Sequence, residues 1–113
     1  MVSIHTNGGP PTANGTEQFI RPGASASEIS LATEIHTQLV SSGLRDRRVQ
    51  NRVVSLIQRV SIPNALSEVA FHSNSELAPG QVITDEERLH TSSDDLATLI
   101  AEGIINYLNE QDQ

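Results

Sequence analysis

The last quarter of the sequence carries the feature that most limits the fold. Apolar residues recur there every three or four positions, which is the spacing of one face of an α-helix. The stripe consists of Leu96, Leu99, Ile100, Gly103, Ile104, Tyr107 and Leu108. Ser92 or Ser93 can cap the start of this helix, and Asp94 and Asp95 suit the positive end of the helix dipole. A helix with one apolar face needs a second layer to cover that face.

A second amphipathic helix is predicted further upstream. Ser25 or Ser27 can cap its start, and the segment 41–43 closes it. Its apolar face carries Ile29, Ala32, Ile35, His36, Leu39 and Val40. Because His36 shares that face, we expect it to be a partly buried packing residue.

Short segments rich in β-branched and apolar residues predict strands at 1–5, 16–20, 53–57 and 65–71. Residues 6–15 are expected to form a loop, and 72–92 an irregular polar segment with a short helical piece near 85–89. The basic run 44–52 is either a solvated connection or a contact for the carboxylates of a ligand, and we favour the first. Strands flanked by covering helices indicate an α/β fold.

Composition excludes several classes of function. The 113 residues suffice for one domain, and seven arginines, no lysine and 14 acidic residues give a net charge of −7. Such a surface repels nucleic acid and anionic lipid. The lack of cysteine excludes disulfides and thiolate metal sites. No apolar run approaches the ~20 residues that span a bilayer, and no signal peptide is visible.

Two ionisable residues stand where strands are expected to be buried. His5 closes the first strand and precedes a Gly-rich loop, and Glu68 lies within an otherwise apolar strand. Burial raises the pKa of a carboxyl, which suits a general base near neutral pH, and a histidine at a strand end suits a metal ligand. The alternatives are a structural histidine and an ion pair between Glu68 and an arginine. His72 and His90 are expected to be solvated.

Five segments in order resemble one family. They are "VSIHTN", "GTEQFI", "SGLRDRRV", "IPNALSEVAFHSN" and "LATLIAEGIINYL". They are similar to the C-terminal part of zinc-dependent N-acetylmuramoyl-L-alanine amidases of the type-3 family. The resemblance implies a twisted mixed sheet covered by amphipathic helices. It also implies a cell-envelope or extracellular hydrolase that cleaves, during peptidoglycan catabolism, the amide joining the lactyl group of muramic acid to L-alanine.

The resemblance assigns roles to particular residues. His5 matches a zinc-ligand histidine, and Glu68 matches the catalytic glutamate that accepts a proton from the attacking water. Glu17 matches a common family position with a structural or substrate-facing role, and Asn7 is expected to orient the loop beside His5. The implied cofactor is Zn²⁺, and the implied partners are peptidoglycan and muropeptides.

The family pattern also places two further zinc ligands upstream of the "SIH" segment. One is a histidine in an H-G-G turn, and the other is a glutamate on the following helix. Residues 1–113 are therefore expected to be a partial, truncated amidase catalytic domain lacking the N-terminal strand and helices of the family. An upstream segment or a second chain would complete the site. We expect the isolated chain neither to retain zinc nor to release muramoyl-linked peptides.

Three interpretations stay open at this point. The chain is either an amidase part or a non-catalytic peptidoglycan-binding or regulatory remnant of the same fold with an incomplete zinc site. A third reading is a damaged reading frame, in which an exposed sheet edge favours aggregation or self-pairing.

Overall fold

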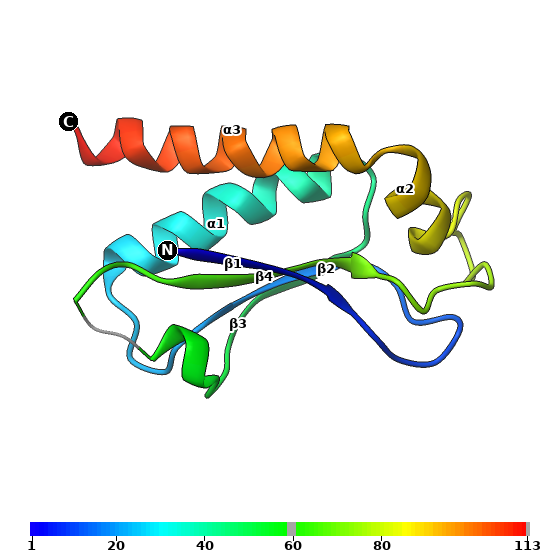
Figure 1. Cartoon of the computed structure of the whole chain (residues 1–113), viewed down its shortest axis with the longest axis horizontal. Coiled ribbons are helices and arrows are strands. Elements are labelled where there is room, and N and C mark those ends of the chain that lie inside the picture. The colour runs from blue at the N-terminus through cyan, green and yellow to red at the C-terminus, as the bar shows by residue number, and fades with distance from the viewer. Residues whose placement is uncertain (59–60, 113) are drawn as a thin grey trace.

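The computed structural model describes residues 1–58 and 61–112 and has an α/β architecture. The strands are β1 (Val2–Asn7), β2 (Thr16–Ile20), β3 (Asp46–Asn51) and β4 (Ala65–Phe71). The helices are α1 (Ala26–Ser41), α2 (Asp85–Thr91) and α3 (Ser93–Gln111), with a short 3₁₀ turn, η1 (Ser55–Ile57). Figure 1 shows α1 and α3 on one side of a twisted sheet and η1 on the other. The expected fold class is confirmed.

The four strands form one mixed sheet in the order β1-β4-β2-β3. β1 runs parallel to β4, β2 runs parallel to β3, and the central pair β2 and β4 is antiparallel. The carboxyl ends of β1 and β4 therefore meet the amino ends of β2 and β3 at one rim of the sheet. β1 and β3 are the two edge strands, and their outer sides lie at opposite ends of the sheet.

Helix α1 covers the sheet because the predicted N-terminal cap and the predicted apolar face are both present. Ser25 caps it through a capping box with Glu28, whose carboxylate also accepts two hydrogen bonds from Arg21 Nε at 3.1 Å. Those contacts hold the pKa of Glu28 below its usual range, with Arg21 as the largest cause. The apolar stripe of α1 then faces the sheet, although Ile29 is exposed rather than packed.

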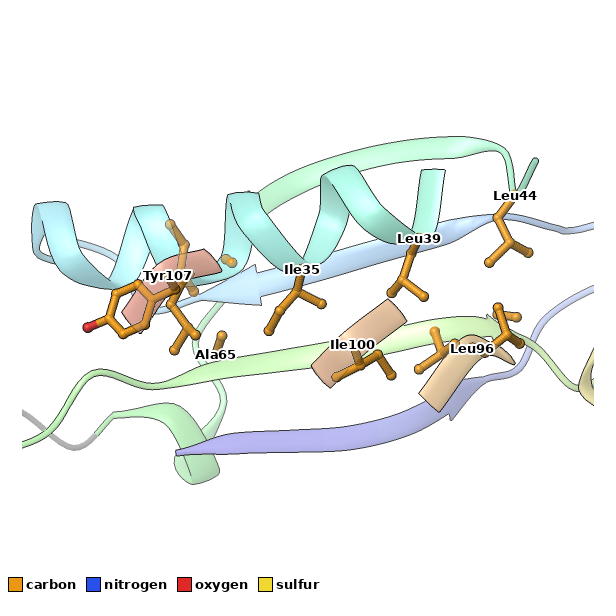
Figure 2. Close-up of a cluster of buried hydrophobic side chains, with 12 residues drawn as sticks. Ile35, Leu39, Leu44, Ala65, Leu96, Ile100 and Tyr107 are labelled. Carbon is orange, nitrogen blue, oxygen red and sulfur yellow. The ribbon is translucent and has the colours of Figure 1, made fainter. Parts of the chain in front are cut away.

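Helix α3 packs along α1, and the two helices together close the core (Figure 2). The buried cluster includes Ile35, Leu39, Leu44, Ala65, Leu96, Ile100 and Tyr107. Gly103 lies at the closest approach, since a Cβ placed there would come within 2.6 Å of Ile35 Cα. None of the helices in the described ranges is both long enough and apolar enough to cross a bilayer.

Asp85 anchors the irregular segment after β4 to the sheet. Its buried carboxylate accepts hydrogen bonds from the backbone N–H groups of Gly15 at 2.7 Å and Phe71 at 3.0 Å. Its own N–H donates to Asn74 Oδ1 at 2.7 Å. One side chain therefore joins the start of β2, the end of β4 and the start of α2.

Three sequence expectations about elements are wrong. The first strand does not stop at His5, because after a shift in register Asn7 still pairs with Phe71 of β4. The expected strand at 53–57 is instead the turn η1, where Ile57 packs against Phe19. The run expected as a connection at 44–52 contains β3, which pairs with β2 along an edge of the sheet.

Candidate functional site

The strand register brings the two predicted site residues together. His5 of β1 pairs with Glu68 of β4, and Glu68 pairs in turn with Glu17 of β2. Residues opposite one another on neighbouring strands project from the same face of a sheet. The three side chains therefore form one row across β1, β4 and β2. That row lies on the face opposite α1, because Gln18 and not Glu17 contacts the α1 residue His36.

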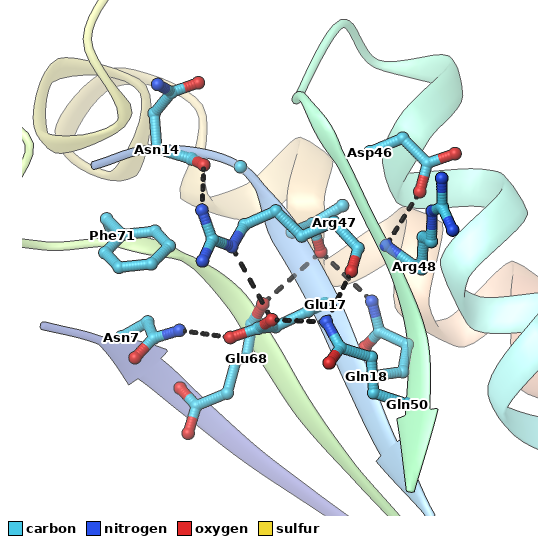
Figure 3. Close-up of polar contacts among 12 residues, drawn as sticks. Asn7, Asn14, Glu17, Gln18, Asp46, Arg47, Arg48, Gln50, Glu68 and Phe71 are labelled. Atoms are coloured by element: carbon cyan, nitrogen blue, oxygen red, sulfur yellow. Dashed lines mark hydrogen bonds and ion pairs between the residues drawn. The ribbon is translucent and has the colours of Figure 1, made fainter. Parts of the chain in front are cut away.

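Glu68 carries an unpaired carboxylate in this row. Among the described residues, none donates a hydrogen bond to its buried Oε2 atom, and no dashed line reaches its carboxylate in Figure 3. Burial raises the pKa of the Glu68 carboxyl above its usual range, and the positive charge available on His5 acts against that rise. The negative charge of Glu17 raises the pKa of Glu68 further, whereas Arg52 and His72 lower it.

Glu17, in contrast, is fully engaged by neighbouring side chains (Figure 3). Asn7 donates to its Oε1 at 2.7 Å, and Gln50 donates to its Oε2 at 3.2 Å. Arg47 Nε lies 3.5 Å from the same Oε2. Glu17 is only 6% exposed and its two oxygens face protein donors, an arrangement that favours the structural role over the substrate-facing one.

The row thus combines the exposed imidazole of His5, the Glu68 carboxylate, to whose buried Oε2 no described residue donates, and the buried carboxylate of Glu17. Residues 1–106 match the model of the Amidase_3 family, described as N-acetylmuramoyl-L-alanine amidase. The chain belongs to this amidase family.

Similar proteins and solved structures are longer than this chain. It is 33% identical over 112 residues to the uncharacterized protein YqiI of Bacillus subtilis (strain 168), covering 97% of this chain and 52% of that protein. The solved N-acetylmuramoyl-L-alanine amidase of Clostridium difficile 630 superposes with a TM-score of 0.80 at 27% identity, covering 96% of this chain and 56% of that one.

A third similar structure is the catalytic domain of CwlV, the N-acetylmuramoyl-L-alanine amidase of Bacillus (Paenibacillus) polymyxa var. colistinus. It gives a TM-score of 0.70 at 27% identity, covering 97% of this chain and 55% of that domain. The amidase chain thus spans about half the length of the relatives it matches.

Two arginines of the basic run, Arg47 and Arg52, contact aromatic side chains of this protein. The Arg47 guanidinium lies 4.8 Å from the centre of the Phe71 ring, and that of Arg52 lies 4.9 Å from the Phe19 ring. Such contacts place a positive charge over the negative face of an aromatic ring. Arg47 also forms an ion pair with the buried carboxylate of Glu17. The basic run in the sequence could have suggested a partner of this kind for a buried glutamate.

The other histidines mostly match expectation. His72 follows β4 directly and is exposed, with Nδ1 3.0 Å from Thr6 Oγ1. His90 is exposed as expected, but it lies in α2 and not in a loop. His36 is buried in a polar bridge, with Nε2 2.7 Å from Asp46 Oδ1 and Nδ1 3.0 Å from Gln18 Nε2. That bridge ties α1 to both β2 and β3.

The donors on this sheet face supply only part of a zinc site. Within the described part of the amidase chain, no group of three His, Cys, Asp or Glu residues is arranged to hold a metal ion. Both Glu17 oxygens are committed to protein donors, which leaves the His5 imidazole and the Glu68 carboxylate. Catalytic zinc sites use three protein ligands and an open position. These two residues fit part of such a site, but they do not supply all three protein ligands.

Replacing Glu17 with glutamine should lower the pKa of Glu68. The substitution removes a negative charge from the adjacent strand and frees Arg47, and both changes favour ionised Glu68. A pH titration of side-chain carboxyl ¹³C shifts in the purified chain measures this directly. Glu76→Gln, in an exposed loop, is the matched control and should leave the Glu68 titration unchanged. An unchanged or higher pKa in Glu17→Gln would contradict the expectation.

Proposed function

We propose that this chain provides the part of a peptidoglycan amidase domain that carries the general base. The reaction is hydrolysis of the amide between the lactyl group of muramic acid and L-alanine. The observation that supports it most is the adjacent placement of His5 and the unpaired Glu68 on one open sheet face, within a chain of the amidase family.

Glu68 would act as general base and then as general acid. Its Oε2 accepts no hydrogen bond from the described residues, so a lone pair is available for the proton of an attacking water. Because burial raises its pKa, the carboxylate is a stronger base than an exposed glutamate. After the attack, protonated Glu68 can deliver the proton to the departing amine of L-alanine.

His5 would be one ligand of a catalytic Zn²⁺, with the remaining ligands supplied by residues outside this sequence. Zinc in such a site polarises the amide carbonyl and makes its bound water more acidic. His5 is exposed on β1, so its imidazole is accessible from the open face. In this proposal residues 1–113 are a partial catalytic domain that acts at the cell wall.

A chimera tests this function. The segment of the CwlV catalytic domain that this chain matches is replaced by the chain itself, which yields a single continuous domain. Release of L-alanine amino termini from purified peptidoglycan is then measured. Glu68→Gln should reduce turnover about 100-fold or more, since general bases contribute at least that factor. Glu76→Gln is the control. A folded, zinc-loaded chimera without turnover, or one whose turnover survives Glu68→Gln, would contradict the proposal.

Glu68→Gln should also stabilise the fold at neutral pH. A variant that is more stable but inactive has lost the base and has not misfolded. A raised pKa means that ionised Glu68 is less favourable in the folded state than in the unfolded state. Above the raised pKa, wild type carries this penalty and Glu68→Gln does not. As the pH falls below the ordinary carboxyl pKa, Glu68 becomes protonated in the unfolded state as well as in the folded state, and the difference should vanish.

The second candidate is a binding module that holds peptidoglycan peptides without hydrolysis. The observation in its favour is that the described residues offer only part of a zinc donor set. Titration of the isolated chain with muropeptides, followed by NMR, distinguishes the two. Shifts near His5 and Glu68 in the absence of turnover support binding, and the absence of shifts counts against it.

A further inference from the structure

Arg88 of α2 has a guanidinium group whose hydrogen-bonding capacity the protein uses only in part. Its Nη1 donates to the carbonyl oxygen of Ser42 at 2.9 Å. Its Nε is buried, and among residues 1–58 and 61–112 no group accepts a hydrogen bond from it. Within the same ranges, no carboxylate forms an ion pair with Arg88 or with Arg45. A buried charged donor without an acceptor is unfavourable, and an anionic ligand would relieve that cost.

A pocket of about 810 Å³ opens beside this guanidinium. Its wall is formed by the loop before β2, the turn after α1, the loop before α2 and α2 itself. A volume of this size is typical of sites that bind small ligands. Neither His5 nor Glu68 lines the pocket, so it is separate from the row of side chains on the open sheet face.

The charge that this pocket presents is positive. Arg45 is exposed in its wall, and Arg88 is half-buried there. The wall also contains Asp85, but this residue is 2% exposed and its carboxylate accepts hydrogen bonds from the N–H groups of Gly15 and Phe71. Because the whole chain has a net charge of −7, the pocket favours a ligand with a single negative charge over a polyanion.

Hydrogen bonds hold the pocket wall in place. Gln81 Oε1 accepts from the N–H of Ala78 at 2.9 Å, and Gln81 Nε2 donates to Asn74 Oδ1 at 2.6 Å. The bond from Arg88 to the carbonyl of Ser42 fixes the guanidinium against the turn after α1. A site whose side chains are already ordered loses less conformational entropy when a ligand binds.

The loop before α2 adds an apolar surface next to the two arginines. Its apolar residues in the wall are Ala78, Pro79, Val82 and Ile83. Val82 is 91% exposed, although the loop that carries it is tied down at Gln81. Apolar surface beside a guanidinium suits a ligand that joins a carboxylate to a small aliphatic group. The last residue of a peptide has this combination, and polar groups for its amide are offered by Thr12 and Asn14.

We propose that this pocket binds the C-terminal carboxylate of a short peptide whose last side chain is small and aliphatic. The carboxylate accepts hydrogen bonds from the Nε and Nη2 edge of Arg88, and Arg45 adds a second positive charge. The last side chain of the peptide packs on the wall that contains Val82. A planar guanidinium matches a carboxylate with two parallel hydrogen bonds. Because His5 and Glu68 lie outside the pocket, this binding goes beyond the proposed function.

An NMR titration of the full chain with three probes tests the proposal. The probes are acetyl-alanyl-alanine with a free carboxylate, the same peptide as its C-terminal amide, and inorganic phosphate. With the free acid we expect saturable shifts in the backbone amides of 78–83 and in the Nε–H of Arg88. The amide should bind about 10-fold more weakly or worse, because it loses the hydrogen bonds to the charged group. Phosphate should also bind more weakly, because it leaves the apolar wall uncovered.

Variants of the same chain locate the binding. Arg88→Gln should weaken binding of the free acid about 10-fold or more. Arg52→Gln is the matched control, because it removes the same charge from an arginine that lies over the Phe19 ring and outside the pocket, and it should retain binding. Glu68→Gln should retain binding as well, so the peptide site and the proposed function can fail separately. Circular dichroism checks that each variant is folded.

Four results would overturn this assignment. They are an absence of saturable shifts with the free acid, equal binding of the amide, equal or tighter binding of phosphate, and full binding by folded Arg88→Gln. Equal binding of phosphate would show a general anion site and no peptide site. If Arg88→Gln does not fold, the comparison of the three probes on the wild-type chain still decides between these outcomes.

Discussion

Replacing Asp85 with alanine is expected to lower the free energy of unfolding by about 2–5 kcal/mol, because it leaves two buried backbone donors without a partner. The donors are the N–H groups of Gly15 and Phe71, which both bond to the Asp85 carboxylate. Neither can turn toward water without separating β2 or β4 from α2. Urea unfolding followed by circular dichroism measures the change.

Two variants sharpen this test. Asp85→Asn keeps an acceptor oxygen and should lose less stability than Asp85→Ala. Asp112→Ala removes an exposed carboxylate at the end of α3 and should stay within about 0.5 kcal/mol of wild type. An Asp85→Ala protein as stable as the Asp112→Ala protein would show that the anchor contributes nothing.

Replacing Gly103 with valine is expected to destabilise the fold by about 3 kcal/mol, through overpacking between α1 and α3. An added Cβ would lie 2.6 Å from Ile35 Cα and 2.9 Å from Ile35 N. Both atoms belong to the backbone of α1, so no side-chain rotation can make room. The helices must move apart, which would loosen the core around Ile100.

Gly103→Ala sets strain against helix propensity, since alanine is favoured over glycine by ~1 kcal/mol inside a helix. It should still destabilise, by less than valine. Gly8→Ala is the matched glycine control, because its added Cβ would meet only the flexible His72 ring at 3.4 Å. Thermal unfolding of the three variants measures the order. Equal stability of Gly103→Val and wild type would mean that the helix contact is looser than described.

Local patterns were enough to predict much of the architecture. The stripes of α1 and α3 follow from spacing, since each helix buries one apolar face, and the strands β2 and β4 follow from short segments rich in β-branched and apolar residues. β3 was missed because its stability comes from pairing with β2, and a charged edge strand has no apolar signature. The strand predicted at 53–57 is wrong for the opposite reason. Apolar residues of this segment pack in a small cluster around Phe19 and are not part of the sheet.

The candidate site, like the fold, could be predicted only in part from the sequence. His5 and Glu68 stood out as ionisable residues on apolar strands. Their adjacency depends on the pairing of β1 with β4, which joins residues 63 positions apart in the sequence and which no local pattern encodes. The full set of donors around Glu17 was likewise not predictable. Asn7 and Gln50 come from the two strands at opposite edges of the sheet, and only the strand order brings them to one carboxylate.

Tyr107 gives this molecule an intrinsic optical reporter. The sequence contains one tyrosine and no tryptophan, so the ultraviolet emission of the free chain comes from a single phenol ring. That ring is part of the wall of an apolar groove of about 500 Å³ between β1 and the C-terminal half of α3. A tryptophan-free ligand that enters the groove should change the intensity or anisotropy of this emission, which permits unlabelled screening of natural or designed binders.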